Sequence, residues 1–235
     1  MHIPDGYLGP QTYGAAYLAV VPFWALASKV LNRTLRSRQV PLLALAAAFS
    51  FVIMMFNVPI PGGTTGHPVG AVLIAVLLGP WAACVAVSIV LIVQALLFGD
   101  GGLTCLGANC LNMAVIMPFV GYGVYRLISA RSAPTSPRRW LGAAIGGYLG
   151  LNAAALAAAF MFGIQPALAH DAAGRALYAP YPLKVALPAM ALTHLLVFGL
   201  VEALVTGLVV AYLQRVDVSL LYRVGSTPEQ REPAP

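Results

Sequence analysis

Long apolar runs separated by short polar connections dominate the chain. Crossing the hydrocarbon core of a bilayer takes about 20 helical residues. The runs that approach or exceed this length cover residues 12–31, 40–57, 81–98, 105–128, 138–164 and 185–213. Backbone groups inside a bilayer have no water to bond, so only helices or closed barrels cross it, and these runs are too long for the roughly ten-residue alternating strands of a barrel. The pattern predicts an all-α integral membrane protein.

A seventh apolar segment, residues 68–79, decides the predicted topology. Its sequence, PVGAVLIAVLLG, is short for a crossing and ends at the helix breaker Gly79-Pro80. If it crosses, all three clusters of basic residues fall on one side, which is the arrangement expected for the cytoplasmic face. The clusters are Lys29, Arg33, Arg36 and Arg38; Arg126, Arg131, Arg138 and Arg139; and Arg215, Arg223 and Arg231. We therefore predict a bundle of seven transmembrane helices in the cell membrane, with the N-terminus outside and the C-terminus in the cytoplasm.

Composition agrees with this assignment. Hydrophobic residues make up 60% of the 235 positions and charged residues only 9%, far below the quarter that is usual in soluble domains. The formal charge of +6 is accounted for by the basic connections, so we expect membrane lipid and no nucleic acid as a partner. One transmembrane domain is predicted over 1–213, and the Pro-rich, charged segment 214–235 is expected to be a disordered cytoplasmic tail.

Small residues and cysteines each allow two interpretations. Ala44 and Ala48 have the small-xxx-small spacing that lets helices approach closely in lipid, so this face either packs internally or docks a membrane partner subunit. Cys84, Cys105 and Cys110 are odd in number and lie in or beside apolar runs, which favours plain packing over disulfides. A redox or metal role for Cys105 and Cys110 stays open.

No recognisable catalytic motif occurs in the sequence, and we predict that the chain is not an enzyme. It contains no phosphate-binding GxxxxGK[ST] loop, HExxH or GxSxG, so uphill transport would need a gradient or another subunit. Glu202 is costly at membrane depth and has either an interhelical hydrogen-bonding role or a coupling role. A membrane metalloenzyme would use His67, His194 and Glu202, but a zinc-ligand pair at helical spacing is missing. A gradient-driven permease would use Glu202 and His194 as a relay.

The histidine at position two is the most specific chemical feature. A free α-amine, the amide nitrogen of His2 and its imidazole Nδ1 can close fused chelate rings on one metal ion, and His67 could supply a fourth nitrogen. Planar nitrogen donation suits Ni(II) or Cu(II). Pro4, Asp5 and Gly6 can turn this segment back into the bundle. The alternative is that His2 is a disordered terminal residue and His67 a loop histidine, in which case the metal ligands would be sought among His170, His194 and the cysteines.

Three segments resemble the CbiM/NikM family, the substrate-capture S components of energy-coupling-factor transporters for cobalt and nickel. They are MHIPDGYLGP at 1–10, NVPIPGGTTGHPVGAVLIAVLLGPWAA at 57–83 and QALLFGDGGLTCLGANCLNM at 94–113. The resemblance implies that Ni(II) or Co(II), the transported substrate rather than a catalytic cofactor, is held by the Met1 amine, the His2 amide and imidazole, and the His67 imidazole. The start MHIPDG looks more like the nickel branch than the MHIMEG start of the cobalt branch.

The resemblance also implies surroundings and partners. Asn57, Thr65, Asp100 and Asn109 are expected to orient the ligands through hydrogen bonds. The expected partners are a transmembrane coupling protein, two cytoplasmic ABC-type ATPases and, in some members, a small accessory membrane protein. Because the chain stops after a short polar tail, we expect that accessory protein to be separate or absent.

Overall fold

The computed structural model describes residues 1–218 and 221, and nearly all of them belong to helices or to short connections between helices. The α-helices are α1 (Pro10–Thr34), α2 (Val40–Met54), α3 (Ala71–Leu78), α4 (Pro80–Val93), α5 (Leu106–Cys110), α6 (Met117–Ile128), α7 (Pro137–Gly163), α8 (Gln165–Leu168), α9 (Leu183–Thr193) and α10 (Gly199–Val216). A 3-10 turn, η1 (Ser37–Gln39), precedes α2. Of three π-helical segments, η2 (Gln94–Phe98) ends α4, η3 (Leu111–Ile116) joins α5 to α6, and η4 (His194–Phe198) joins α9 to α10. A two-stranded antiparallel hairpin, β1 (Val58–Pro59) and β2 (Thr65–Gly66), lies between α2 and α3.

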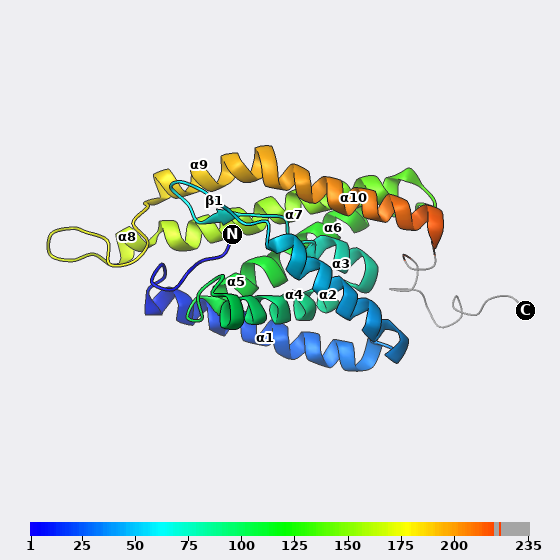
Figure 1. The fold of residues 1–235 in the computed structure, drawn as a ribbon, viewed down its shortest axis with the longest axis horizontal. Helices are drawn as coiled ribbons and strands as arrows, with labels where there is room; N and C mark the ends of the chain where they lie inside the picture. The colour runs from blue at the N-terminus through cyan, green and yellow to red at the C-terminus, as the bar shows by residue number, and fades with distance from the viewer. Residues whose placement is uncertain (219–220, 222–235) are drawn as a thin grey trace, which may run out of the picture.

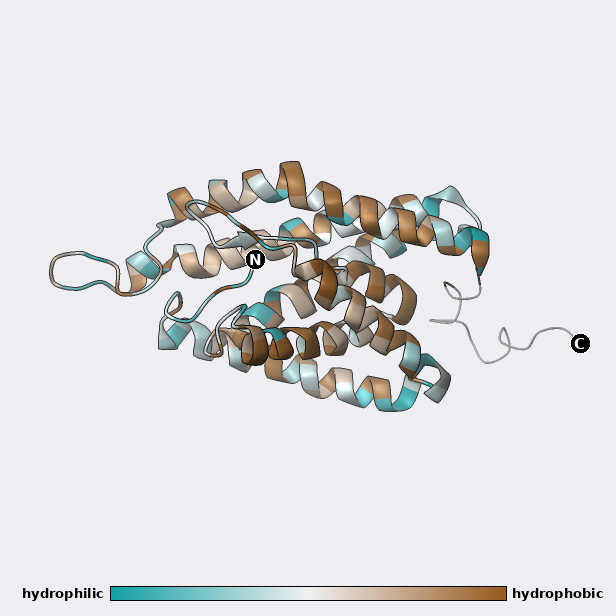
Figure 2. Ribbon diagram, in the orientation of Figure 1, coloured by the Kyte–Doolittle hydropathy of each residue, from teal (hydrophilic) through white to brown (hydrophobic). Residues whose placement is uncertain are grey.

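Within the described residues, five continuous helical segments are long and apolar enough to cross a membrane. They are Pro10–Thr34, Pro80–Phe98, Leu106–Ile128, Pro137–Leu168 and Leu183–Val216, and the shorter α2 is also apolar. Figure 2 shows that hydrophobic residues follow the helices while hydrophilic residues gather toward the connections at their ends. Leu18 is 79% exposed and Leu127 is 81% exposed, as expected for side chains that face lipid. The prediction of a multi-pass helical membrane protein is confirmed.

Helix α3 is the short seventh segment, and it lies inside the bundle. All eight of its residues are buried, so it meets protein and not lipid. Gly70 and Gly79 bracket the helix with φ values of 74° and 91°, a left-handed region that favours glycine. Together the two glycines let the chain enter and leave a helix of eight residues within the core. The number of crossings and the orientation of the termini stay predictions.

Close packing of helices explains the glycines and alanines of α7. A Cβ added at Gly146 would lie 2.4 Å from the carbonyl oxygen of Gly121 on α6, and one added at Gly150 would lie 2.6 Å from that of Met117. The backbones of α6 and α7 therefore touch directly. In contrast, Ala44 and Ala48 are both exposed on α2, so the docking interpretation for this pair stays a prediction.

The N-terminal segment, the β1–β2 hairpin and the connection 99–105 meet inside the bundle. Figure 1 places the N-terminus beside the β1–β2 hairpin, between the long α7, α9 and α10 on one side and α1, α4 and α5 on the other. Met1 and Ile3 are fully buried, so the N-terminal segment is inserted into the bundle as the sequence predicted. Most of the predicted tail, residues 219–220 and 222–235, lies outside the described residues, and α10 runs to Val216.

Candidate metal centre

The N-terminal segment is held in the bundle by main-chain bonds at Ile3. Asn109, on α5, accepts a hydrogen bond from the Ile3 amide at 2.8 Å and donates one to the Ile3 carbonyl at 3.1 Å. The amide of Gly102 donates a second bond to that carbonyl at 2.9 Å. With Ile3 fixed on both sides, residues 1 and 2 have little freedom to leave the core.

Asp5 provides a second anchor on the same connection. Its carboxylate accepts hydrogen bonds from the amides of Leu103 at 3.1 Å and Thr104 at 2.8 Å, and from the Thr104 hydroxyl. The bond from that hydroxyl is the main reason why the pKa of Asp5 lies below its ordinary value. Cys105 donates from Sγ to the carbonyl of Pro4 at 3.3 Å, so this cysteine supports the turn. From the sequence, Asp5 is expected only as a turn residue, and this anchoring role is not predicted.

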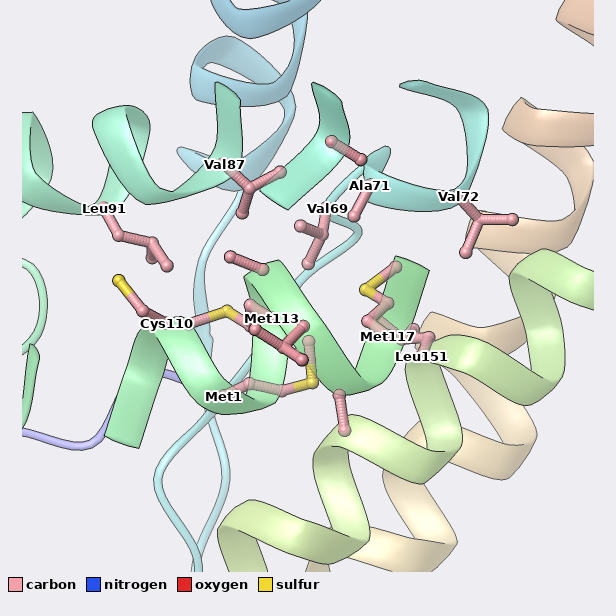
Figure 3. Close-up of a cluster of buried hydrophobic side chains, with 14 of the residues drawn as sticks. Met1, Val69, Ala71, Val72, Val87, Leu91, Cys110, Met113, Met117 and Leu151 are labelled. Atoms are coloured by element: carbon pink, nitrogen blue, oxygen red, sulfur yellow. The ribbon is translucent and has the colours of Figure 1, made fainter. Parts of the chain in front are cut away.

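Met1 places its amine at the centre of the site and its side chain in the core. The amine donates to the carbonyl oxygen of Thr65 and, at 2.9 Å, to its hydroxyl, and it lies 3.3 Å from His67 Nε2. Figure 3 shows the Met1 side chain among buried apolar side chains that include Met113 and Cys110. The side chain therefore anchors the terminus, and the nitrogen is the group presented to the site.

The two imidazoles lie together, and each has one nitrogen engaged. The ring centroids of His2 and His67 are 4.7 Å apart. His67 Nδ1 lies 3.1 Å from the carbonyl of Pro68, so a proton there leaves Nε2 bare toward the amine. His2 Nε2 lies 3.2 Å from Gln94 Oε1, which leaves Nδ1 as its bare nitrogen; among the described residues Nδ1 has no hydrogen-bond partner, with Asp100 at 3.5 Å.

Burial keeps these nitrogens neutral near pH 7. It lowers the pKa of the Met1 amine from 8.0 to about 4 and that of His2 from 6.5 to about 3, and it holds the pKa of His67 well below 6.5. The same burial raises the pKa of Asp100 above its ordinary value. Neutral amine and imidazole nitrogens have free lone pairs, which is the form that coordinates a metal.

The four predicted orienting residues all lie around this cluster. Thr65 bonds the amine, Asn109 bonds Ile3, and Asp100 lies beside His2. Asn57 donates from Nδ2 to both carboxylate oxygens of Asp100, at 3.1 and 3.2 Å. These contacts agree with an orienting role, which stays a prediction.

Gln94 is not among the residues predicted for the site, although the sequence carries a signal for it. Gln94 is the only Asp, Glu, Asn, Gln, Lys, Arg or His within the apolar run 81–98, and it is fully buried. A polar side chain in such a run normally faces the bundle interior and finds a partner. That reasoning would have placed Gln94 in the core, but not opposite His2.

The remaining candidate residues lie in other surroundings. His170 is exposed and stays at the surface connection beside Asp171. His194 is fully buried; its Nδ1 lies 2.8 Å from the Met190 carbonyl, and Nε2 has no hydrogen-bond partner in the described part of the chain. Cys84, Cys105 and Cys110 are buried and free. Glu202 bonds main-chain amides, which agrees with the hydrogen-bonding interpretation.

The cluster would bind metal through four nitrogens, two from the main chain and two from imidazoles. Within the residues that the structure describes, no group of three or more His, Cys, Asp or Glu side chains is placed to hold a metal ion. The available donors are the amine of Met1, the amide nitrogen of His2, Nδ1 of His2 and Nε2 of His67. Such a set can enclose an ion that accepts planar nitrogen donation.

Comparison with known proteins identifies the family. The family model described as the cobalt uptake substrate-specific transmembrane region, CbiM, matches residues 2–220. The chain is 56% identical to the fused nickel transport protein NikMN of Rhodobacter capsulatus, over 98% of this chain and 67% of that protein. It is 42% identical to the cobalt transport protein CbiM of Acetohalobium arabaticum, over 63% of this chain and 61% of that protein.

Two solved structures of transition metal transporters have the same fold as this chain. A crystal structure of a transition metal transporter has 52% sequence identity and a TM-score of 0.89, and the match covers 99% of this chain and all of that one. A truncated transition metal transporter has 55% identity and a TM-score of 0.87, over 92% of this chain and 99% of that one. The resemblance found in the three sequence motifs thus extends over nearly the whole chain, which belongs to the CbiM family of membrane metal-transport proteins.

Proposed function

We propose that this protein captures Ni(II), or Co(II), at the outer face of the membrane as the substrate-binding subunit of an ATP-driven energy-coupling-factor importer. The observation that carries this proposal is the convergence of the Met1 amine, His2 and His67 in the bundle, where His67 Nε2 faces the amine at 3.3 Å and His2 Nδ1 has no hydrogen-bond partner among the described residues. Relatives named for nickel and for cobalt transport support the choice of metals.

The proposed chelate explains why the terminus itself must be inserted. The Met1 amine, the His2 amide and His2 Nδ1 form two fused rings on one ion, and His67 Nε2 completes the plane. The 3.3 Å between the amine and His67 Nε2 agrees with two neighbouring corners of such a plane. The His2 amide binds only after it loses its proton, so the metal–nitrogen bond must be strong enough to offset the free energy of deprotonation. This requirement favours Ni(II) over Zn(II), Mg(II) or Ca(II). The MHIPDG start favours nickel as the transported ion.

Topology and partners complete the proposal. Seven crossings, with α3 crossing inside protein, place the three basic clusters on the cytoplasmic side and the metal site outside. A transmembrane coupling protein and two ABC-type ATPases would supply the energy that this chain has no motif to supply, with or without a small accessory membrane protein. The exposed Ala44 and Ala48 on α2 are the proposed contact for the coupling protein.

The test is metal binding by the detergent-purified protein with an untagged N-terminus. One extra residue before Met1 moves the free amine out of chelate range, and His67→Ala removes the fourth nitrogen. Both variants should lose tight nickel binding in calorimetry. His170→Ala, an exposed histidine, is the matched control and should bind as the wild type does.

Tight binding by both variants would overturn the proposed chelate. A partner-independent, gradient-driven permease is the alternative for the transport step. It would give sustained nickel flux when the chain alone is placed in vesicles without ATP, whereas we expect none. The engagement of Glu202 by main-chain amides speaks against its use as a mobile proton carrier.

A further inference from the structure

Glu202 is a carboxylate in the bundle core whose partners are main-chain amides. It lies in the first turn of α10 and is fully buried. Neither of the ion pairs His2–Asp100 and Arg175–Asp171 involves Glu202, and no Lys, Arg or His side chain among the described residues forms a salt bridge with it. A buried charge without a counter-ion is costly and requires hydrogen bonds from other donors.

Those donors are main-chain amides at the start of α3. Glu202 Oε2 accepts from the Val69 amide at 2.8 Å, and the Gly70 amide donates to Oε1 at 3.0 Å and to Oε2 at 3.1 Å. Thr206 lies one turn further along α10, with its hydroxyl 3.5 Å from Oε1. The first amides of a helix have no partner inside it and carry partial positive charge, so a carboxylate suits this position.

The bonded segment directly follows a proposed metal ligand. Only Pro68 separates His67 from Val69, and the Pro68 carbonyl receives the His67 Nδ1 proton at 3.1 Å. On the other side, the Ser50 hydroxyl of α2 donates to the Val69 carbonyl at 2.7 Å. Val69 is thus held from two helices, at its amide by Glu202 and at its carbonyl by Ser50. With proline restricting the one intervening residue, the position of Val69 determines where the His67 ring lies.

We propose that Glu202 is a positioning residue for metal capture: its carboxylate fixes Val69 and Gly70 so that His67 Nε2 faces the Met1 amine. This inference rests on the proposed function. Glutamine cannot reproduce all of these bonds, because it has one acceptor oxygen. With that oxygen in place of Oε2, its NH2 group would lie where Oε1 now accepts from the Gly70 amide, so two donors would face each other. Glu202 thereby connects α10 to the metal site without touching the metal.

The experiment compares Glu202→Gln with the wild type in nickel binding and in the ligand-field absorption of bound Ni(II). Nickel affinity should fall about 10- to 100-fold. Because the chelate formed by Met1 and His2 does not depend on Glu202, the spectrum should shift toward that of His67→Ala, with weaker splitting after one nitrogen is lost. A purely structural role would reduce the amount of folded protein and leave the spectrum of the folded fraction unchanged.

Two further variants make the result decisive. Asn152→Ala changes a buried polar residue of α7 that bonds the Tyr148 carbonyl in its own helix, and it should keep the wild-type spectrum. Should Glu202→Gln not fold, Ser50→Ala releases Val69 from the other side and should give the same spectral shift to a smaller extent. A wild-type affinity and spectrum in Glu202→Gln, or in Ser50→Ala in that second case, overturns the inference. Absence of nickel and cobalt binding by the wild type would instead overturn the proposed function.

Discussion

The number of protons released on nickel binding tests whether the site is preformed in its neutral state. At pH 7, an amine with its ordinary pKa of 8.0 carries about 0.9 proton, and each imidazole with a pKa of 6.5 carries about 0.25. With the amide proton of His2, a chelate made from unperturbed groups would release about 2.4 protons. Burial lowers the pKa of the amine to about 4 and that of His2 to about 3, and it lowers that of His67 as well. Only the amide proton then remains, so about one proton should be released.

The assay is titration calorimetry with Ni(II) at pH 7 in buffers of different ionisation enthalpy, in which the slope of the observed enthalpy gives the protons released. A peptide of residues 1–10 is the control, because its amine and its single imidazole keep ordinary pKa values and it should release about two. A protein value above two would refute the argument from burial, and a value near zero would show that the His2 amide keeps its proton. Release of one proton also predicts the pH dependence of binding: nickel affinity should fall about tenfold for each unit of decreasing pH near neutrality. The fall should be steeper near pH 4, where the amine gains a proton.

Three further predictions concern the surroundings of the site. Gln94 Oε1 accepts the proton on His2 Nε2 and so keeps Nδ1 free for metal. Gln94→Leu removes this acceptor, and nickel affinity should fall about tenfold in calorimetry. An unchanged affinity would contradict the placement of the proton on Nε2. Gly66→Ala would place Cβ 2.0 Å from Phe198 Cε2, whereas Gly14→Ala meets nothing within 4 Å; the first should lower the melting temperature of the metal-free protein in detergent, and equal melting of the two variants would refute the packing argument. Asn109→Ala breaks both side-chain bonds to Ile3 and should expose the N-terminus to an aminopeptidase that leaves the wild type intact, so equal resistance would show that other contacts hold it.

The helices could be predicted from sequence because lipid imposes a simple rule. Every backbone group must be satisfied inside a span, so length and hydropathy alone located the six long runs, and each became helical. The interior position of α3 did not follow from that rule. Its run is as apolar as the others, and only tertiary contacts show that it lies in protein.

Part of the site could also be predicted, because His2 and His67 are rare donors in polar connections. The groups that fix them could not be assigned, since they act across the sequence: Gln94 lies 92 positions from His2, and Glu202 lies 133 positions from Val69. From the sequence, Glu202 is expected to have either a hydrogen-bonding or a coupling role. Its partners are two main-chain amides, and any residue type except proline can supply such an amide, so they could not be identified from the sequence.

The three π-helical segments have a consequence for how the two ends of the bundle relate. Gln94 opens η2, His194 opens η4, and Asn109 precedes η3 by two residues. A π turn holds one more residue than an α turn, and one residue corresponds to a rotation of about 100° along a helix. At η3 and η4, where another helix continues, each extra residue shifts the phase of the helix, so the buried faces before and after the segment need not share one heptad pattern. Loss of a single residue from η3 or η4 would rotate the following helix by about 100° against the preceding one, so the length of these two segments matters more to the packing than their composition.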